Sequence, residues 1–220
     1  MDYINEKLKV WINKFIDWDI YNQFKTVMNT VLPMYDSTKI FPEQDKLLRV
    51  FKETLPTDIK VILIGMDPYP GSHNGKPSAC GRSFATENGY VNPSLRNLIQ
   101  ELQSDIGKIE SPFDYSLQHW VDQGVFLYNT SLTVEEGRSG SHIKLWKNFT
   151  ENFISNFSRE NPNVVWILLG NNAKYFSEFI QSEKIVLAAH PSPLAGGKFF
   201  GSRIFSRTNA FLEEKDKIQW

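Results

Sequence analysis

The chain has 220 residues, a hydrophobic fraction of 41% and a formal net charge of −1 at pH 7. That length fits one domain over residues 1–220, with a core large enough to be stable without covalent cross-links. The longest apolar runs are too short to cross a bilayer. Because Cys80 is the only cysteine, the composition excludes an internal disulfide, a cysteine zinc site and an iron–sulfur cluster. The near-neutral charge does not indicate a nucleic-acid partner, although it is compatible with a local cationic groove.

Residues 1–36 carry aromatic and aliphatic side chains among charges, a pattern that predicts one or two amphipathic helices. The first six residues contain no basic segment followed by a small-residue cleavage site, so we expect no secretory signal. A further helix is predicted to start near residues 41–43 and to end before Pro56. Its apolar residues at helical spacing are Leu47, Leu48, Phe51 and Leu55.

Val61 to Ile64 form an uninterrupted apolar run, which predicts a strand buried on both faces of a parallel sheet. The prolines of the loop that follows, residues 66–84, remove backbone donors, and its glycines allow tight turns. The loop therefore presents Asp67 at the carboxyl end of the strand. In open α/β sheets that edge is where ligands bind.

Asn92 and Pro93 have the residue types of a helix N-cap and first turn, and the apolar stripe behind them predicts a helix closed by Gly107. Further buried strands are predicted at residues 125–128, 164–169 and 185–189, with amphipathic stretches between them and a closing helix from Arg203. This alternation predicts an α/β fold: a single domain with a central, mostly parallel four-stranded sheet flanked by helices.

Each predicted strand ends on a residue that can do chemistry or that permits close approach of the backbone. These ends are Asp67, Asn129, the pair Gly170-Asn171, and His190. In a parallel sheet all four lie on one edge, which brings a carboxylate, an amide and an imidazole together. Each of these residue types is also a common strand terminator or helix cap, but the four together favour a site.

Several ligand-binding signatures are missing from the chain. Residues 71–78 resemble a phosphate-binding loop only superficially, because Pro70 and Pro77 occupy the positions of its first glycine and its hydroxyl residue. The four histidines show no metal-ligand spacing, so we expect no metal site. The hypothesis of a generic α/β nucleotide-binding domain is not supported, because the sequence contains no phosphate-binding motif.

Two loops carry a resemblance to a known family. Residues 65–70, Gly-Met-Asp-Pro-Tyr-Pro, and residues 190–194, His-Pro-Ser-Pro-Leu, are similar to the Gly-Gln-Asp-Pro-Tyr-His and His-Pro-Ser-Pro-Leu loops of family 1 uracil-DNA glycosylases. Segments 93–95, 127–133, 168–170, 199–203 and 206–209 also match that family, in its order. The resemblance covers most of the chain from about Trp18 onward.

The resemblance implies a monofunctional hydrolase of base excision repair, which flips uracil out of DNA and cleaves its N-glycosidic bond to leave an abasic site. Asp67 would be the catalytic anion that orients water and stabilises the cationic sugar; near its reference pKa of about 3.9 it would be ionised at neutral pH. His190 would face uracil O2 as a neutral donor, beside the main-chain N–H groups of Met66 and Asp67. The resemblance implies no metal and no organic cofactor.

Base recognition and DNA contacts are implied in the same way. Asn129 would pair with the O4/N3 edge of uracil, Phe84 would stack on the base, and Tyr69 would exclude the methyl group of thymine. Leu194 would be the wedge that replaces the flipped base. The residues implied to contact the DNA backbone are Pro93, Ser94, Asn171 and Ser192, with Lys198 as a candidate partner for a phosphate.

The chain departs from the family pattern at several positions. Met66 replaces the usual glutamine, Pro70 replaces the usual histidine, and the loop at residues 195–198 is shortened and lacks the usual arginine. The segment after His142 is one residue short. Since proline has neither a titratable side chain nor an N–H, we expect Pro70 to affect the rate more than the choice of base. It leaves open a second hypothesis, a DNA-binding or replication-accessory protein whose chemistry has weakened.

The implied partners are uracil-containing DNA, single- or double-stranded, and an acidic inhibitor protein that mimics DNA. We expect a monomer without membrane contact, located in the cytoplasm or wherever the host's DNA is kept.

Overall fold

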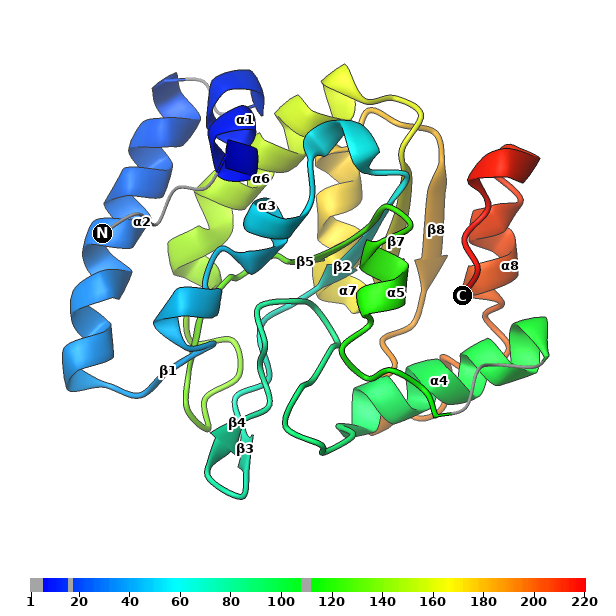
Figure 1. Ribbon diagram of the computed structural model, residues 1–220, viewed down its shortest axis with the longest axis horizontal. Coiled ribbons are helices and arrows are strands. Elements are labelled where there is room, and N and C mark those ends of the chain that lie inside the picture. Colours follow the sequence, from blue (N-terminus) through cyan, green and yellow to red (C-terminus); the bar gives the residue numbers. More distant parts are fainter. Residues whose placement is uncertain (1–5, 16–17, 108–111) are drawn as a thin grey trace.

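The structure, a computed structural model, describes residues 6–15, 18–107 and 112–220. Residues 1–5, where the sequence predicts no secretory signal, lie outside those ranges. Within them, a four-stranded sheet lies between layers of helices (Figure 1). None of the described helices is both long and apolar enough to cross a membrane.

The central sheet confirms the predicted α/β class. Its strands are β2 (Val61–Gly65), β5 (Val125–Asn129), β7 (Val165–Leu169) and β8 (Ile185–Ala188). Their order in space is β5-β2-β7-β8, and each neighbouring pair is parallel. Since the whole sheet is parallel, all four carboxyl ends lie on one edge, as the site hypothesis requires.

Helices cover both faces of this sheet. They are α1 (Glu6–Phe15), α2 (Trp18–Ser37), α3 (Arg49–Glu53), α4 (Pro93–Ile106), α5 (Gln118–Val121), α6 (Ile143–Glu160), α7 (Gly170–Tyr175) and α8 (Ile204–Asn209), with 3₁₀ turns at residues 44–46, 56–58, 176–179, 193–195 and 214–216. Short antiparallel pairs join β1 (Ile40–Phe41) to β6 (Val134–Glu135) and β3 (Ser72–His73) to β4 (Lys76–Pro77). The β3–β4 hairpin projects beyond the carboxyl edge of the sheet (Figure 1).

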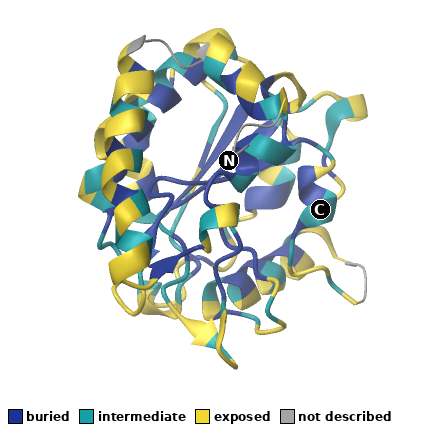
Figure 2. Cartoon of the chain, turned by 60° about the vertical axis from the view of Figure 1, so that its left-hand side comes forward, coloured by how far each residue is buried: buried dark blue, intermediate teal, exposed yellow. Residues whose placement is uncertain are grey.

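Strand residues alternate between two apolar cores. Ile62, Ile64, Phe126 and Trp166, with their neighbours, pack toward α1, α2, α3 and α6. In Figure 2 the inner strands of the central sheet are buried and the outward face of α2 is exposed. Trp11 is fully buried in this core, where its Nε1 donates a hydrogen bond of 2.8 Å to the carbonyl of Thr54. The amphipathic pattern of residues 6–15 and 18–36 therefore reflects packing.

The opposite core lies under α4, α5 and α8. Val61, Leu63 and Ile167 contribute to it from the sheet. The rings of Trp120 and Trp220 meet edge to face with their centroids 5.2 Å apart, a favourable geometry for an aromatic pair. The carboxyl-terminal residue is therefore part of the core.

Three elements differ from their sequence predictions. The helix expected before Pro56 is a 3₁₀ turn and the short α3, because Leu48, at φ −109° and ψ 25°, interrupts the helical backbone between them. The run at residues 185–189 contains an edge strand whose Leu187 is 37% exposed, so it is not buried on both faces. The closing helix is only α8, which ends at Asn209.

The predicted helix after Asn92 is confirmed as α4, with Pro93 in its first turn and Gly107, at φ +89°, at its C-cap. The side chain of Asn92 makes no capping hydrogen bond, and its Nδ2 is buried without a partner among the described residues.

A buried ion pair fixes the second half of the loop after β2. The Arg82 side chain is fully buried and forms two hydrogen bonds with the Glu53 carboxylate, of 2.7 and 2.8 Å. It also donates to the carbonyl of Ser116 at 2.7 Å. Because a planar guanidinium matches a carboxylate in two places, this pair holds the residues just before Phe84 against α3.

We predict that Glu53→Ala lowers the free energy of unfolding by about 3 kcal/mol, because it leaves the Arg82 guanidinium buried without its charge partner. For a chain of this size that corresponds to a fall in melting temperature of roughly 6–12 °C. Urea denaturation with thermal scans measures both. Lys215→Ala is the control: it breaks a pair whose side chains are 76% exposed and should leave stability nearly unchanged, because water and salt screen an exposed pair. Equal effects in the two variants would contradict a structural role for the buried pair.

Candidate active site

A cavity of about 600 Å³ opens at the carboxyl edge of the sheet. The site residues predicted from the sequence line it, except Pro93 and Lys198. Those lining residues are Met66, Asp67, Tyr69, Phe84, Ser94, Asn129, Asn171, His190, Ser192 and Leu194. They come from the ends of β2, β5, β7 and β8 and from the start of α4, so the tertiary structure brings distant segments into one place.

The Asp67 loop leaves the sheet along a continuation of the β2–β5 pairing. The N–H of Thr130 donates to the carbonyl of Gly65, and the N–H of Ser131 donates to that of Met66, each at 2.9 Å. The Thr130 hydroxyl adds a hydrogen bond of 2.8 Å to the Met66 carbonyl. Within the described residues, the N–H groups of Met66 and Asp67 have no acceptor. They are therefore available to a ligand.

Asp67 is held by a turn that is far away in the sequence. Its Oδ2 accepts a hydrogen bond of 2.6 Å from the N–H of Gly140 and one of 3.0 Å from the Ser139 hydroxyl. Burial raises the pKa of Asp67 above its usual range, and these two hydrogen bonds act in the opposite direction. The expectation from the sequence that Asp67 titrates near its reference pKa is therefore wrong, because the carboxyl group is partly buried.

His190 lies at the end of β8 against a glycine. Burial lowers its pKa below the usual 6.5, so the ring is neutral at pH 7. Its Nδ1 accepts a hydrogen bond of 3.0 Å from the N–H of Ser192, which places the proton of the neutral ring on Nε2. At Gly170, φ is +85° and a Cβ would lie 2.8 Å from the Cβ of His190. Only glycine lets the imidazole approach this closely.

The Asn129 amide lies over a second glycine. A Cβ on Gly65 would lie 2.2 Å from Asn129 Oδ1 and 2.8 Å from the Cβ of Ser83. Asn129 is 6% exposed, and its side chain has no hydrogen-bond partner among the described residues. An accessible but unpaired amide in a cavity can read a ligand edge that both donates and accepts.

Two aromatic side chains shape the wall of the cavity. Phe84 is 8% exposed, takes a left-handed backbone conformation at φ +62°, and has its ring centroid 5.9 Å from that of His190. The Tyr69 hydroxyl donates to the carbonyl of Phe84 at 2.9 Å. Burial raises the pKa of Tyr69, so the hydroxyl stays protonated. The pair therefore forms a rigid apolar wall that suits a flat ring.

The loop after His190 presents an apolar tip to solvent. Leu194 is 97% exposed, and its N–H donates to the Ser192 hydroxyl at 3.2 Å. Asn97 of α4 ties this loop down by donating to the carbonyl of Pro191 at 2.7 Å. Lys198 is exposed further along the loop and does not line the cavity.

Sequence reasoning missed several residues of the cavity. Arg82, Ser139 and Asn172 line it. Arg82 stands in the loop after β2, but nothing in the sequence pairs it with Glu53. The glycines on either side of Arg138 and Ser139 were the available signal of a tight turn.

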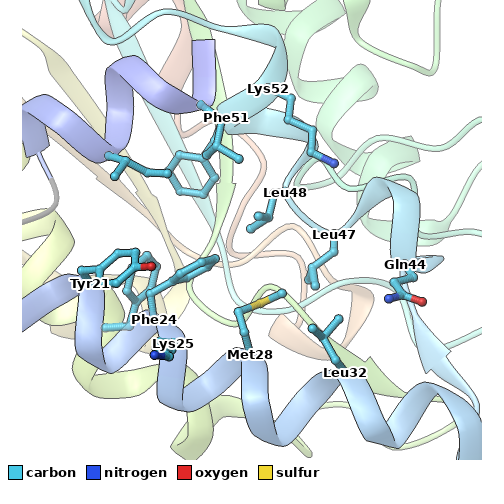
Figure 3. A pocket seen from close by; sticks show the side chains of 13 residues that line it. Tyr21, Phe24, Lys25, Met28, Leu32, Gln44, Leu47, Leu48, Phe51 and Lys52 are labelled. Atoms are coloured by element: carbon cyan, nitrogen blue, oxygen red, sulfur yellow. The ribbon is translucent and has the colours of Figure 1, made fainter. Parts of the chain in front are cut away.

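A second, smaller cavity lies between α1, α2 and the α3 segment (Figure 3). Its volume is about 240 Å³, and side chains such as Phe24, Met28 and Leu47 line it. No carboxylate, imidazole or thiol is among its lining residues. In the part of the chain that the structure describes, no group of three or more His, Cys, Asp or Glu side chains is placed to hold a metal ion.

An ionisable carboxyl group, a neutral imidazole and an unpaired amide line one cavity on this α/β fold. Such a set defines a candidate active site for a ring compound with polar edges. The family model of the uracil DNA glycosylase superfamily matches residues 51–213. A uracil-DNA glycosylase of Exiguobacterium sibiricum is 38% identical over 204 residues, which cover 90% of this chain and 91% of that protein. The chain belongs to the uracil-DNA glycosylase superfamily.

Solved structures agree with this assignment. Mimivirus uracil-DNA glycosylase aligns with a TM-score of 0.85 at 25% identity, covering 99% of this chain and 90% of that chain. A variant of the mimivirus enzyme, solved in complex with UGI, aligns with a TM-score of 0.86 over 99% of this chain and 91% of that chain.

We predict that the His190 ring carries its proton on Nε2 at pH 7 and titrates below pH 6.5, because burial disfavours the imidazolium and Nδ1 already accepts a hydrogen bond. ¹⁵N NMR of the imidazole nitrogens against pH measures both properties, and the signal missing from His190→Gln assigns the ring. A proton on Nδ1, or a midpoint above 6.5, would contradict the prediction.

Proposed function

We propose that this protein is a monofunctional uracil-DNA glycosylase, which flips a uracil nucleotide out of DNA and hydrolyses its N-glycosidic bond in base excision repair. The observation that carries the proposal is the convergence of Asp67, Asn129 and His190 on one cavity in a chain of this superfamily. Cleavage of that bond develops positive charge on the sugar and negative charge on the base, and these residue types match both charges.

Asp67 serves the sugar side of the reaction. As an anion it orients the attacking water and stabilises the cationic sugar as the bond to the base breaks. Its carboxylate is held in one orientation by Gly140 and Ser139, so little reorganisation is needed during reaction. Since burial raises its pKa, activity is lost on the acid side as the carboxylate takes up a proton.

His190 serves the base side. The proton on its Nε2 makes it a neutral donor to uracil O2, on which negative charge develops as the base leaves. The unpaired N–H groups of Met66 and Asp67 are further donors to the same anion. These groups stabilise charge without a metal ion or an organic cofactor.

Asn129, Phe84 and Tyr69 select the base. The Asn129 amide pairs with O4 and N3 of uracil and cannot satisfy the reversed pattern of cytosine while its side chain is held in one orientation. Phe84 stacks on the ring, and Tyr69, fixed through its hydrogen bond to Phe84, occupies the space beside C5 where thymine carries a methyl group.

The rim of the cavity binds the DNA. Leu194, almost fully exposed, enters the stack where the base has left. The polar and main-chain contacts to the DNA backbone come from Pro93, Ser94, Asn171 and Ser192, with Lys198 as an outer cation.

Uracil-containing DNA, single- or double-stranded, is the proposed partner. The neighbour solved with UGI supports a second one, an acidic inhibitor protein that mimics DNA and docks on the same rim. The protein acts as a monomer, in the cytoplasm or in the compartment that holds the host's DNA.

Pro70 favours one alternative, a DNA-binding protein with weakened chemistry. It lines the cavity but offers neither a titratable group nor an N–H. Direct measurement of uracil release separates the alternatives.

We predict that the protein releases uracil from a labelled oligonucleotide with a single uracil, in EDTA, and releases no thymine from the matched control. Asp67→Asn should reduce the single-turnover rate by roughly 10²- to 10⁴-fold, because the amide carries no negative charge and is a poor base. A wild type that binds the oligonucleotide but releases nothing would favour the DNA-binding alternative. Release that stops in EDTA would contradict a metal-free reaction.

We predict that Gly65→Ala lowers kcat/KM for uracil release by about 10²-fold, since the new Cβ displaces the Asn129 amide by an ångström or more. Gly71→Ala is the matched control: it lies in the same loop, and its Cβ would meet nothing within 4 Å. Wild-type kinetics in Gly65→Ala, with its fold verified by circular dichroism, would mean that the position of Asn129 does not decide base binding.

A further inference from the structure

The turn at residues 136–140 is docked on the Asp67 loop at several points. The N–H of Gly137 donates to the carbonyl of Pro70 at 2.8 Å. The N–H of Gly140 and the hydroxyl of Ser139 both donate to Asp67 Oδ2, at 2.6 and 3.0 Å. Ser139 Oγ lies farther from Oδ1, at 3.3 Å. Oδ1 therefore keeps most of its acceptor capacity for water or sugar.

This turn is itself held in place. The Glu136 carboxylate pairs with Lys39 at 2.7 Å and accepts from the Ser72 hydroxyl at 3.1 Å. The N–H of Glu136 donates to the carbonyl of Lys39 at 2.9 Å. The turn is therefore hydrogen-bonded to Lys39, the residue before β1, and to Ser72, the first residue of β3. Because it is fixed at both points, it can hold the Asp67 side chain in one orientation.

Asp67 has no such side-chain donors directly beside it in its own loop. Its neighbours are Met66 and Pro68, and Pro70 has neither a side-chain donor nor an N–H. The Thr130 hydroxyl, which lies nearby, is engaged with the Met66 carbonyl. The hydrogen bonds that the carboxylate receives come from the turn.

We propose that Ser139 is a positioning residue, whose hydroxyl, together with the N–H of Gly140, orients the Asp67 carboxylate toward the cavity for the attack of water. The inference rests on the proposed glycosylase function. Ser139 is exposed and touches no reacting atom in this role; it acts through Asp67.

The charged groups around Asp67 are otherwise engaged. Arg82, on the same cavity, is buried in its pair with Glu53, and burial keeps His190 neutral. On the turn itself, Arg138 pairs with Glu135, and Glu136 pairs with Lys39. The pKa of Asp67 is raised by burial and lowered by the bonds from Gly140 and Ser139. Removing the Ser139 hydroxyl therefore moves that pKa further upward.

The test is single-turnover uracil release by Ser139→Ala as a function of pH. Loss of a hydrogen bond to a charged group should lower the rate at pH 7 by about tenfold or more, leave KM for the oligonucleotide unchanged, and raise the midpoint of the acid limb by about one pH unit. Ser139→Thr keeps the hydroxyl and should restore both properties. Thr57→Ala, which removes an exposed hydroxyl that donates to the Asp58 carboxylate at a residue that does not line the cavity, should retain wild-type rate and midpoint.

A second measurement does not depend on activity. ¹³C NMR of the Asp67 carboxyl carbon, assigned with Asp67→Asn, should report the same upward shift of the pKa in Ser139→Ala. If wild type is active and Ser139→Ala matches it in rate, acid midpoint and carboxyl titration, the positioning role is overturned while the glycosylase function stands. If wild type releases no uracil, the proposed function is overturned. If, in addition, the Asp67 carboxyl group titrates at the same pH in Ser139→Ala as in wild type, the positioning role of Ser139 is overturned as well.

Discussion

The last ladder pair between β2 and β5, Gly65 opposite Asn129, is the constraint on which the site depends. Backbone hydrogen bonds continue this pairing past Asn129, so the loop that carries Asp67 leaves the sheet in one direction. Glycine at position 65 lets the Asn129 amide lie over the backbone, and Gly170 in the same way admits the ring of His190. Close approach to two glycines thus positions the amide and the imidazole.

Burial moves the pKa values of the two titrating groups of the site in opposite directions, and only the shift at His190 favours the protonation state that the proposed reaction needs. The pKa of Asp67 is raised and that of His190 is lowered, because a low-dielectric environment disfavours both charged forms. At neutral pH only the Asp67 shift costs stability, since the unfolded chain ionises that carboxyl group more easily. The lowered pKa of His190 reduces the free energy of unfolding only as the pH falls below 6.5, where the unfolded chain binds the proton more easily. The hydrogen bonds from Ser139 and Gly140 reduce the first cost.

The rim of the cavity differs from its base in being exposed and apolar at its tip. Leu194 is 97% exposed on a loop that Asn97 and Ser192 hold in place, so an apolar side chain is presented rigidly to solvent. Few lysines or arginines stand at the cavity, and Arg82 there is neutralised by Glu53. The proposed DNA binding through this rim would rely on polar and main-chain contacts more than on cations, which agrees with the net charge of −1.

The sequence by itself determined the α/β class, the strands and the edge on which chemistry gathers, because uninterrupted apolar runs between amphipathic helices allow little except a covered parallel sheet. It also indicated Asp67, Asn129 and His190, since each stands at or within two residues of the end of a strand. Only the tertiary structure decided that Ser139 and Gly140 clamp Asp67, that Glu53 neutralises Arg82, and that residues 185–188 form an edge strand. These facts depend on contacts between segments far apart in the chain, or on the order of strands in the sheet, and local patterns of residues carry no information about either.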